Sequence, residues 1–183
     1  MSETLTPTCN FGQRAADFKL KCTNNHVWTL DKLRGKRGLL IFFICNHCPF
    51  VKAIIPKLVK VTNSLLDHGI NSAGIMSNDI TAYPEDSFEN MIAFAEKNKF
   101  SFPYLYDETQ EIAKKYGAVC TPDFFGYNIF LELQYRGRLD EYNIKETDKS
   151  FKPELLTAMI EISQYDKGPT NQIPSMGCSI KWK

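Results

Sequence analysis

Apolar and polar positions along the chain alternate between the period of strands and the period of helices. Residues 39–44 are apolar without interruption, as expected for a central strand covered on both faces. Residues 49–67 then keep helical spacing, and residues 71–78 indicate a second strand. The same pattern predicts a hairpin over 14–28, helices that begin at Pro84, Glu108 and Pro153, and strands over 123–128 and 131–136. This alternation predicts one α/β domain over residues 1–183, with 166–183 as an extended surface tail.

Composition and charge exclude several classes of protein. The 22 Lys and Arg residues nearly balance the 21 Asp and Glu residues, so the chain shows no electrostatic footprint for nucleic acid or an anionic membrane. Residues 1–13 lack the apolar core of a signal peptide, and no stretch approaches the ~20 apolar residues of a membrane span. We therefore expect a cytoplasmic protein. Its six cysteines are too sparse for a disulfide scaffold. We expect them to be free thiols, with at most one redox-active pair.

The motif Cys45-Asn46-His47-Cys48-Pro49 carries the candidate chemistry. It lies between the apolar strand and the helix that follows. Two cysteines three positions apart can close a small disulfide ring, and the N-terminus of a helix favours thiolate over thiol. This context predicts a redox-active pair. The alternative is half of a zinc site, which needs two more ligands, and we assign no metal ligands.

Other segments strengthen this interpretation. They are Ala16–Leu20, Phe43–Lys52, Ser77–Asp79, Phe102–Asp107, Tyr116–Pro122 and Gly177–Trp182. Together with the order of strands and helices they resemble the thioredoxin superfamily, and within it the peroxiredoxin-like branch of alkyl hydroperoxide reductase/thiol-specific antioxidant (AhpC/TSA) type. The resemblance implies a thioredoxin fold: a central mixed sheet of about five strands flanked by helices, with an N-terminal β-hairpin and a C-terminal tail. It implies no bound cofactor.

The resemblance also implies roles within the motif. Cys45 is expected to be the nucleophile and Cys48 the resolving thiol, so that the chain exchanges disulfides. We expect Cys45 to have a lower thiol pKa than Cys48. Cys45 faces the helix N-terminus, and the positive charge of a protonated His47 would stabilise its thiolate. His47 would make the pair more oxidising. The alternative for His47 is that it caps the helix or points to solvent.

Pro122 matches the proline that follows a cis peptide bond in this superfamily and lies against the cysteine pair. The backbone of Thr121 is then expected to dock a partner peptide by strand addition. The alternative is a trans proline that begins a strand.

Peroxide reduction is the competing chemistry, with Cys48 as the peroxidatic cysteine. Ile41, Cys45 and Pro122 occupy the positions at which peroxiredoxins carry proline, threonine and an activating arginine. Arg136 or Arg138 could supply a guanidinium group, although surface positions are the better interpretation for both. Disulfide exchange is therefore expected to outrun peroxide reduction.

The remaining candidates are accessory. Asp79 is a weak substitute for the buried acid that thioredoxins carry before their motif. Cys120 and Cys178 could each be a third thiol or a metal ligand, but a buried apolar role for Cys120 and an idle surface thiol for Cys178 are the simpler interpretations. No role is assigned to Cys9 or Cys22.

A third class of function stays open beside the two enzymatic ones. A redox sensor or a metal-binding module would need Cys120 or His47 to converge on the pair. The expected partners are protein or small-molecule disulfides or peroxides and an electron-donating dithiol protein, with assembly as a monomer or homodimer open.

Overall fold

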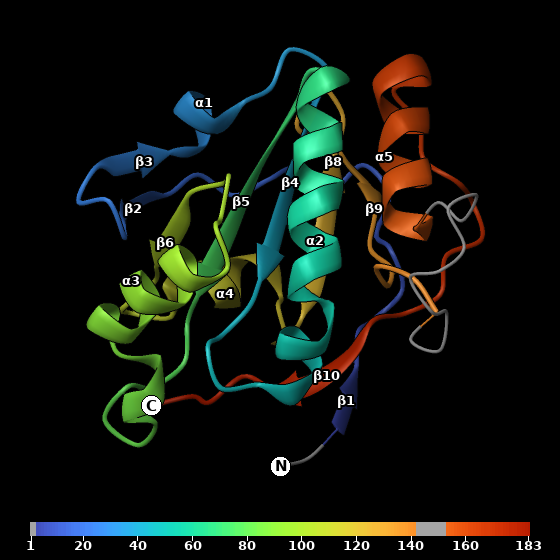
Figure 1. Cartoon of the computed structure of the whole chain (residues 1–183). Coiled ribbons are helices and arrows are strands. Elements are labelled where there is room, and N and C mark those ends of the chain that lie inside the picture. The colour runs from blue at the N-terminus through green and yellow to red at the C-terminus, as the bar shows by residue number, and fades with distance from the viewer. Residues whose placement is uncertain (1–2, 142–152) are drawn as a thin grey trace.

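A central mixed sheet organises the molecule (Figure 1). The computed structural model describes residues 3–141 and 153–183. The seven strands of the main sheet lie in the order β3-β2-β6-β5-β4-β8-β9. Strand β4 (Gly38–Phe43) is parallel to β5 (Ile70–Met76) and antiparallel to β8 (Asp123–Tyr127). The expected α/β class with a mixed sheet is confirmed, but the sheet has seven strands rather than about five.

The outer strands extend this sheet on both sides. Strand β6 (Tyr104–Tyr106) pairs with β5, and β9 (Leu133–Tyr135) pairs with β8. The N-terminal hairpin of β2 (Lys19–Cys22) and β3 (Val27–Thr29) adds the far edge, because β2 pairs with β6. The expected hairpin is thus confirmed.

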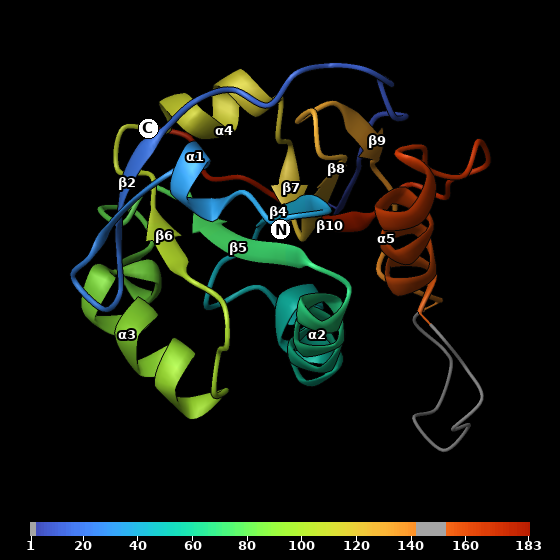
Figure 2. The ribbon, with the colours of Figure 1, turned by 90° about the horizontal axis from the view of Figure 1, so that it is seen from above.

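The two faces of β4 belong to two separate apolar clusters. Leu40, Phe42 and Ile44 pack into one of them, and Leu39, Ile41 and Phe43 pack into the other. This period of two explains why the run is apolar without a break, since both faces are covered. Helices α2 (Pro49–Asp67), α3 (Phe88–Lys97) and α5 (Glu154–Tyr165) lie on the first face, and α1 (Leu30–Leu33) and α4 (Glu111–Tyr116) lie on the other (Figure 2).

A second, three-stranded sheet closes one end of the molecule. Strand β10 (Met176–Ser179) lies between β1 (Glu3–Leu5) and β7 (Cys120–Thr121) and pairs antiparallel with both. The expectation that 166–183 is a tail over the surface is therefore wrong for its last part. Cys178 is buried within this segment. A buried β7 edge needs backbone partners, and β10 supplies them.

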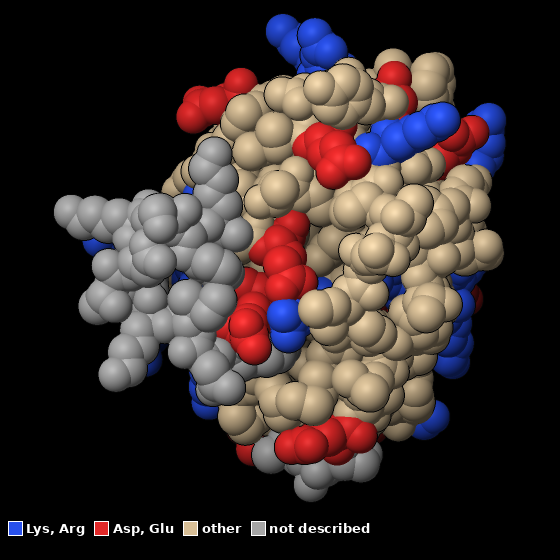
Figure 3. All heavy atoms as spheres, turned by 90° about the vertical axis from the view of Figure 1, so that its right-hand side faces the viewer, with Lys and Arg blue, Asp and Glu red and all other residues tan. Residues whose placement is uncertain are grey.

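The outside of the molecule carries charges of both signs. On the side that shows α5, acidic and basic side chains are interspersed with uncharged surface (Figure 3). No helix in the described ranges has both the length and the apolar character needed to cross a membrane.

The close approach of β10 to β7 predicts a steric requirement for glycine at residue 177. A Cβ atom there would overlap the Thr121 carbonyl. Gly177→Ala should lower the free energy of unfolding by about 1–3 kcal/mol, the usual cost of overpacking. Urea denaturation measures this, with Glu3→Ala on exposed β1 as a control expected within about 0.5 kcal/mol of wild type. An unchanged Gly177→Ala protein would contradict the packing described.

Candidate active site

The second cysteine of the motif begins helix α2. Cys48 is the N-cap residue of that helix, and its side chain is fully buried. The Cys48 sulfur accepts a hydrogen bond from the Val51 backbone N–H, one of the donors that a helix N-terminus leaves without a partner in the helix. It also lies 3.2 Å from the Thr121 carbonyl oxygen, a contact to which the protonated thiol donates.

Cys48 has the lower pKa of the two thiols. The main cause is the hydrogen bond that the Cys45 thiol donates to the Cys48 sulfur, and the Val51 N–H acts in the same direction. These interactions outweigh burial and lower the pKa of Cys48, because hydrogen bonds to a thiolate stabilise the charged form.

Cys45 has a different environment. Its sulfur lies 3.9 Å from His47 Nδ1 and 3.5 Å from Thr121 Oγ1. Donating to Cys48, burial and the negative charge of Asp86 all raise the pKa of the Cys45 thiol. The expectation of a lower pKa at Cys45 is therefore wrong. The sulfur of Cys48, not that of Cys45, meets the backbone N–H at the start of α2.

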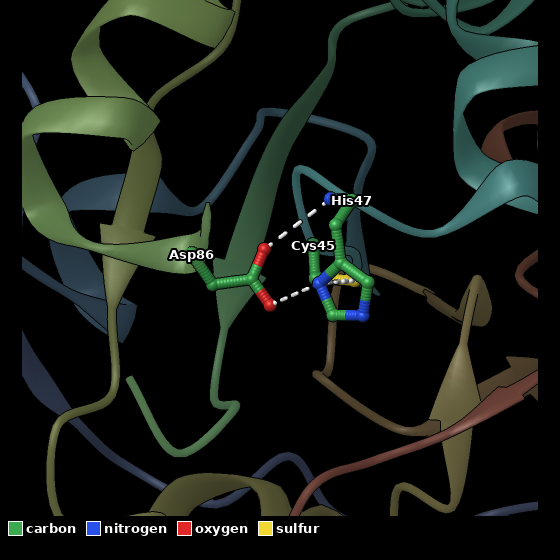
Figure 4. Close-up of side chains that lie close together, drawn as sticks. All are labelled: Cys45, His47 and Asp86. Atoms are coloured by element: carbon green, nitrogen blue, oxygen red, sulfur yellow. Dashed lines mark hydrogen bonds and ion pairs between the residues drawn. The ribbon is translucent and has the colours of Figure 1, made fainter. Parts of the chain in front are cut away.

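A buried carboxylate holds the segment between the cysteines. The Oδ1 atom of Asp86 accepts the backbone N–H of Asn46 at 2.8 Å and that of His47 at 3.3 Å. Its Oδ2 atom lies 2.7 Å from His47 Nδ1 and 2.8 Å from Asn78 Nδ2. Figure 4 shows Asp86 reaching both the backbone and the ring of His47, with Cys45 beside the ring. Asp86 therefore fixes the loop that carries Cys45.

This geometry also fixes the orientation of His47. Because the Asp86 carboxylate accepts, the Nδ1 atom of His47 carries a proton. The ring stacks on Tyr83 at a centroid distance of 5.4 Å, and its Nε2 atom is buried with no hydrogen-bond partner among the described residues. With 14% of its side chain exposed, His47 neither faces open solvent nor caps α2 through its ring.

Asp86 is the residue that sequence reasoning missed. It lies in a short 3₁₀ turn (Pro84–Asp86) before α3, where an acidic residue reads as a helix-start signal. Asp79, the expected acid, instead accepts the Thr81 backbone N–H at 2.9 Å, which is a local turn contact. Asp86, and not Asp79, therefore lies where a buried acid beside the cysteine motif was expected.

The Thr121-Pro122 peptide bond is cis, as expected. Thr121 contacts both sulfurs of the pair, through its hydroxyl and its carbonyl group. Its backbone, however, lies in antiparallel register with Cys178 of β10. The edge expected to receive a partner peptide by strand addition is therefore occupied by the chain itself.

Of the other four cysteines, Cys178 contacts the motif, whereas Cys120, Cys22 and Cys9 form no hydrogen bond with the motif among the described residues. Cys178 is buried, and its thiol hydrogen-bonds to the Cys48 sulfur, so the expectation of an idle surface thiol is wrong. Cys120 donates to the Pro122 carbonyl at 3.5 Å and is fully buried, in line with an apolar packing role. Cys22 is buried in β2, and Cys9 lies partly buried with a pKa raised by desolvation to about 11.

One set of side chains has the donor types of a metal site. Ligand atoms of Cys45, His47 and Asp86 lie within 4.8 Å of one another. A metal-binding module would need Cys120 or His47 to converge on the pair, and of these His47 lies 3.9 Å from the sulfur of Cys45. The same Asp86 carboxylate already accepts four N–H groups, so a metal ion would compete with this network.

The AhpC/TSA family model matches residues 11–141. The chain belongs to the AhpC/TSA family. It is 40% identical to an uncharacterized conserved protein from Geobacillus kaustophilus, whose crystal structure superposes with a TM-score of 0.90 over 100% of this chain and 97% of that one. A hypothetical protein from Sinorhizobium meliloti 1021 is 37% identical, with a TM-score of 0.88 over 98% of both chains.

A curated relative points to the same branch. The Coxiella burnetii protein named "Putative peroxiredoxin bcp" is 24% identical over 115 residues, which are 63% of this chain and 71% of the relative. As an AhpC/TSA member with the thioredoxin fold, the protein is a peroxiredoxin-like oxidoreductase of the thioredoxin superfamily.

The arginines considered for peroxide activation have other partners in this AhpC/TSA protein. Arg136 is buried, with its guanidinium bonded to the Asp123 carboxylate at 2.9 Å and to the Gly117 carbonyl at 2.7 Å. The expectation of a surface position is wrong for Arg136, because the buried Asp123 pairs with it. Arg138 binds Glu154 through two of its nitrogens.

The order of the two thiol pKa values can be tested by ultraviolet thiolate absorbance across pH, which needs no reagent access. The Cys45→Ala variant should raise the Cys48 pKa, because it removes the hydrogen bond that lowers it most. The Cys48→Ala variant should titrate only above the ordinary thiol value of ~8.5. In wild type the Cys48 thiolate should persist at neutral pH and should be lost as the pH falls through the lowered pKa of Cys48. A thiolate that survives to low pH in Cys48→Ala would assign it to Cys45.

Replacing Asp86 by asparagine tests its positioning role. The new NH₂ group would face N–H donors, so Asp86→Asn should cost about 1–3 kcal/mol of unfolding free energy. It should also lower the Cys45 pKa, because the Asp86 charge raises it. Asp79→Asn is the matched control, expected within about 0.5 kcal/mol with an unshifted titration. If Asp86→Asn and Asp79→Asn had the same unfolding free energy and the same thiol titration, the positioning role of Asp86 would be contradicted.

Proposed function

We propose that Cys45 and Cys48 form a catalytic dithiol pair that exchanges electrons with disulfide substrates. The observation that carries this proposal is that both sulfurs meet Thr121 at the N-terminus of α2: Cys45 Sγ lies 3.5 Å from Thr121 Oγ1, and Cys48 Sγ lies 3.2 Å from the Thr121 carbonyl oxygen. One sulfur is stabilised as the thiolate, the reactive form, and the other stands beside it as a thiol. Oxidation can therefore close a disulfide with little rearrangement.

The chemical steps follow from this asymmetry. The Cys48 thiolate attacks one sulfur of a substrate disulfide, and the other substrate sulfur leaves and takes a proton. Cys45 then attacks the Cys48 sulfur of the mixed disulfide and expels the second substrate sulfur, which receives the proton from Cys45. The substrate gains two electrons as two thiols, and the enzyme holds the Cys45–Cys48 disulfide. A dithiol protein is the proposed electron donor that reduces it again.

His47 is proposed to assist at Cys45. When Nε2 also binds a proton, the ring is a cation held by Asp86, with Nδ1 3.9 Å from the Cys45 sulfur. A cation at this distance stabilises a thiolate at Cys45, both when Cys45 attacks and when it leaves.

Access to the pair favours small or flexible disulfides. The Thr121 edge is occupied by β10, and both cysteine side chains are buried. A groove of about 590 Å³ opens beside the motif, and Asn46, His47, Lys52 and Lys97 are among the residues that line it. This groove supports approach of a substrate from the side of His47 rather than along the edge of the sheet.

Peroxide reduction is the second candidate, and the position of Cys48 favours it. A thiolate there could attack one peroxide oxygen and break the O–O bond, giving a sulfenic acid and a hydroxide or alkoxide that takes up a proton. The sulfenic acid then condenses with the neighbouring Cys45 thiol to form the disulfide and water. The name of the Coxiella relative supports this chemistry. The engagement of Arg136 by Asp123 argues against fast activation of the peroxide.

Stopped-flow kinetics with the reduced protein separates the candidates. We expect rapid reduction of oxidised glutathione or a small protein disulfide, and hydrogen peroxide consumption at nearly the rate of an unassisted thiol of low pKa. Cys48→Ser and Cys45→Ser should each lower disulfide turnover by about 100-fold or more, as loss of a reacting group does. Cys120→Ser, the buried-cysteine control, should keep wild-type rates.

Three outcomes would overturn this proposal. The first is peroxide reduction that is orders of magnitude faster than by an unassisted thiol of low pKa and is lost in Cys48→Ser. This result would make peroxide reduction the favoured function. Stoichiometric zinc in the purified protein, lost in the Cys45→Ser variant, would favour the metal-binding module. Reversible oxidation without turnover of either substrate would favour the redox sensor.

A further inference from the structure

The Cys48 sulfur has a second thiol neighbour, from the far end of the sequence. Cys178 lies on β10 in the same buried apolar cluster as Cys45 and Cys48. Its thiol hydrogen-bonds to the Cys48 sulfur, and its side chain is buried. Cys48 therefore stands between two thiols, one from its own motif and one from the C-terminal strand.

Contacts on both sides of Cys178 hold it at this position. Before it, the Ser175 hydroxyl donates to the Pro122 carbonyl at 2.9 Å, and Gly177 packs tightly on Thr121. After it, the Lys181 backbone N–H donates to Asn78 Oδ1 at 2.9 Å. These contacts fix β10 to the cis-proline segment and, through Asn78, to the hydrogen bonds of Asp86. The backbone on both sides of Cys178 therefore holds its side chain next to Cys48.

The charge state of the pair controls the acidity of Cys178. The pKa of Cys178 is raised to about 11; burial is the largest cause, and the hydrogen bond and charge of Cys48 contribute to the same rise. When Cys45 and Cys48 join in a disulfide, Cys48 loses its negative charge. The contributions from Cys48 then vanish, and Cys178 becomes a better nucleophile at the moment an adjacent disulfide exists.

We propose that Cys178 is a third redox-active thiol, which attacks Cys48 within the Cys45–Cys48 disulfide and forms a Cys48–Cys178 disulfide. The proposal rests on the proposed function, because it begins from the oxidised pair. Cys178 loses its proton, the new S–S bond forms as the Cys45–Cys48 bond breaks, and Cys45 leaves as a thiolate that takes up a proton. The oxidation level is unchanged, so no further oxidant is required.

This step would convert β10 into an internal substrate. Its cysteine lies in register with Thr121, at the edge where a bound peptide is expected in this superfamily. The exchange returns Cys45 to the thiol form beside His47 and Asp86 while Cys48 stays oxidised. The C-terminal strand then becomes covalently joined to the N-terminus of α2.

Disulfide mapping of the full chain tests the proposal. Reduced protein is treated with one equivalent of diamide, quenched in acid, alkylated with N-ethylmaleimide and digested for non-reducing mass spectrometry. Wild type should contain both the Cys45–Cys48 and the Cys48–Cys178 linked peptides. Cys45→Ser should form only the Cys48–Cys178 link, Cys178→Ser only the Cys45–Cys48 link, and Cys120→Ser should match wild type.

The possible results separate the two proposals. A folded Cys178→Ser protein with no Cys45–Cys48 link would refute the proposed function, because this variant cannot pass the disulfide on to residue 178. A wild-type protein with that link but no Cys48–Cys178 link overturns the third-thiol proposal alone, even if a variant fails to fold. The third-thiol proposal is also overturned if folded Cys45→Ser, treated in the same way, forms no Cys48–Cys178 link and carries the alkyl label at Cys178.

Discussion

The buried carboxylate of Asp86 is the interaction on which the rest of the site depends. A fully buried charge is costly unless hydrogen bonds compensate it, and Asp86 accepts four N–H groups. Three of these come from Asn46 and His47, so the carboxylate sets the path of the chain between the two cysteines. The fourth comes from Asn78, whose carbonyl oxygen accepts the Lys181 N–H. Through the Asn78 side chain, one acid thereby connects the motif to the segment that follows β10.

The asymmetry of the two sulfurs comes mainly from their interaction with each other, and this arrangement adds to it. Asp86 holds the loop so that its negative charge acts on Cys45, while Cys48 meets the Val51 N–H at the start of α2. The carboxylate and the helix terminus thus act in opposite directions on two neighbouring thiols. In the proposed function, this polarisation makes one sulfur the attacking thiolate and the other the thiol that resolves the intermediate, whether the substrate is a disulfide or a peroxide.

The central strands β4, β5 and β8 and the cysteine motif could be predicted because their signals are local, whereas β6 and the three-stranded sheet were not predicted. An uninterrupted apolar run followed by CxxC and a helix identifies β4, the motif and α2 without any distant partner. The hairpin at β2 and β3 is local as well, since a turn at Asn24-Asn25, with Asn25 at a φ of 65°, joins the two strands. The cis bond at Pro122 was expected only from family resemblance.

What could not be predicted depends on contacts between residues far apart in the sequence. Asp86 is 39 residues from His47 and lies in a segment whose acids read as helix-start signals. Cys178 lies in a short stretch that shows neither strand nor helix periodicity. It is buried because β10 pairs with the edge of β7. Arg136 looked exposed because its buried partner Asp123 could not be recognised in the sequence.

Equilibrium with glutathione redox buffers tests the central claim most directly. The claim is that Cys45 and Cys48 form one reversible two-electron couple. Acid-quenched samples should follow a single transition of about 30 mV per tenfold change in the ratio of oxidised to reduced protein. The transition should be lost in the Cys45→Ser/Cys48→Ser double variant. An unchanged transition in that double variant, or a wild-type protein that never oxidises reversibly, would contradict the account.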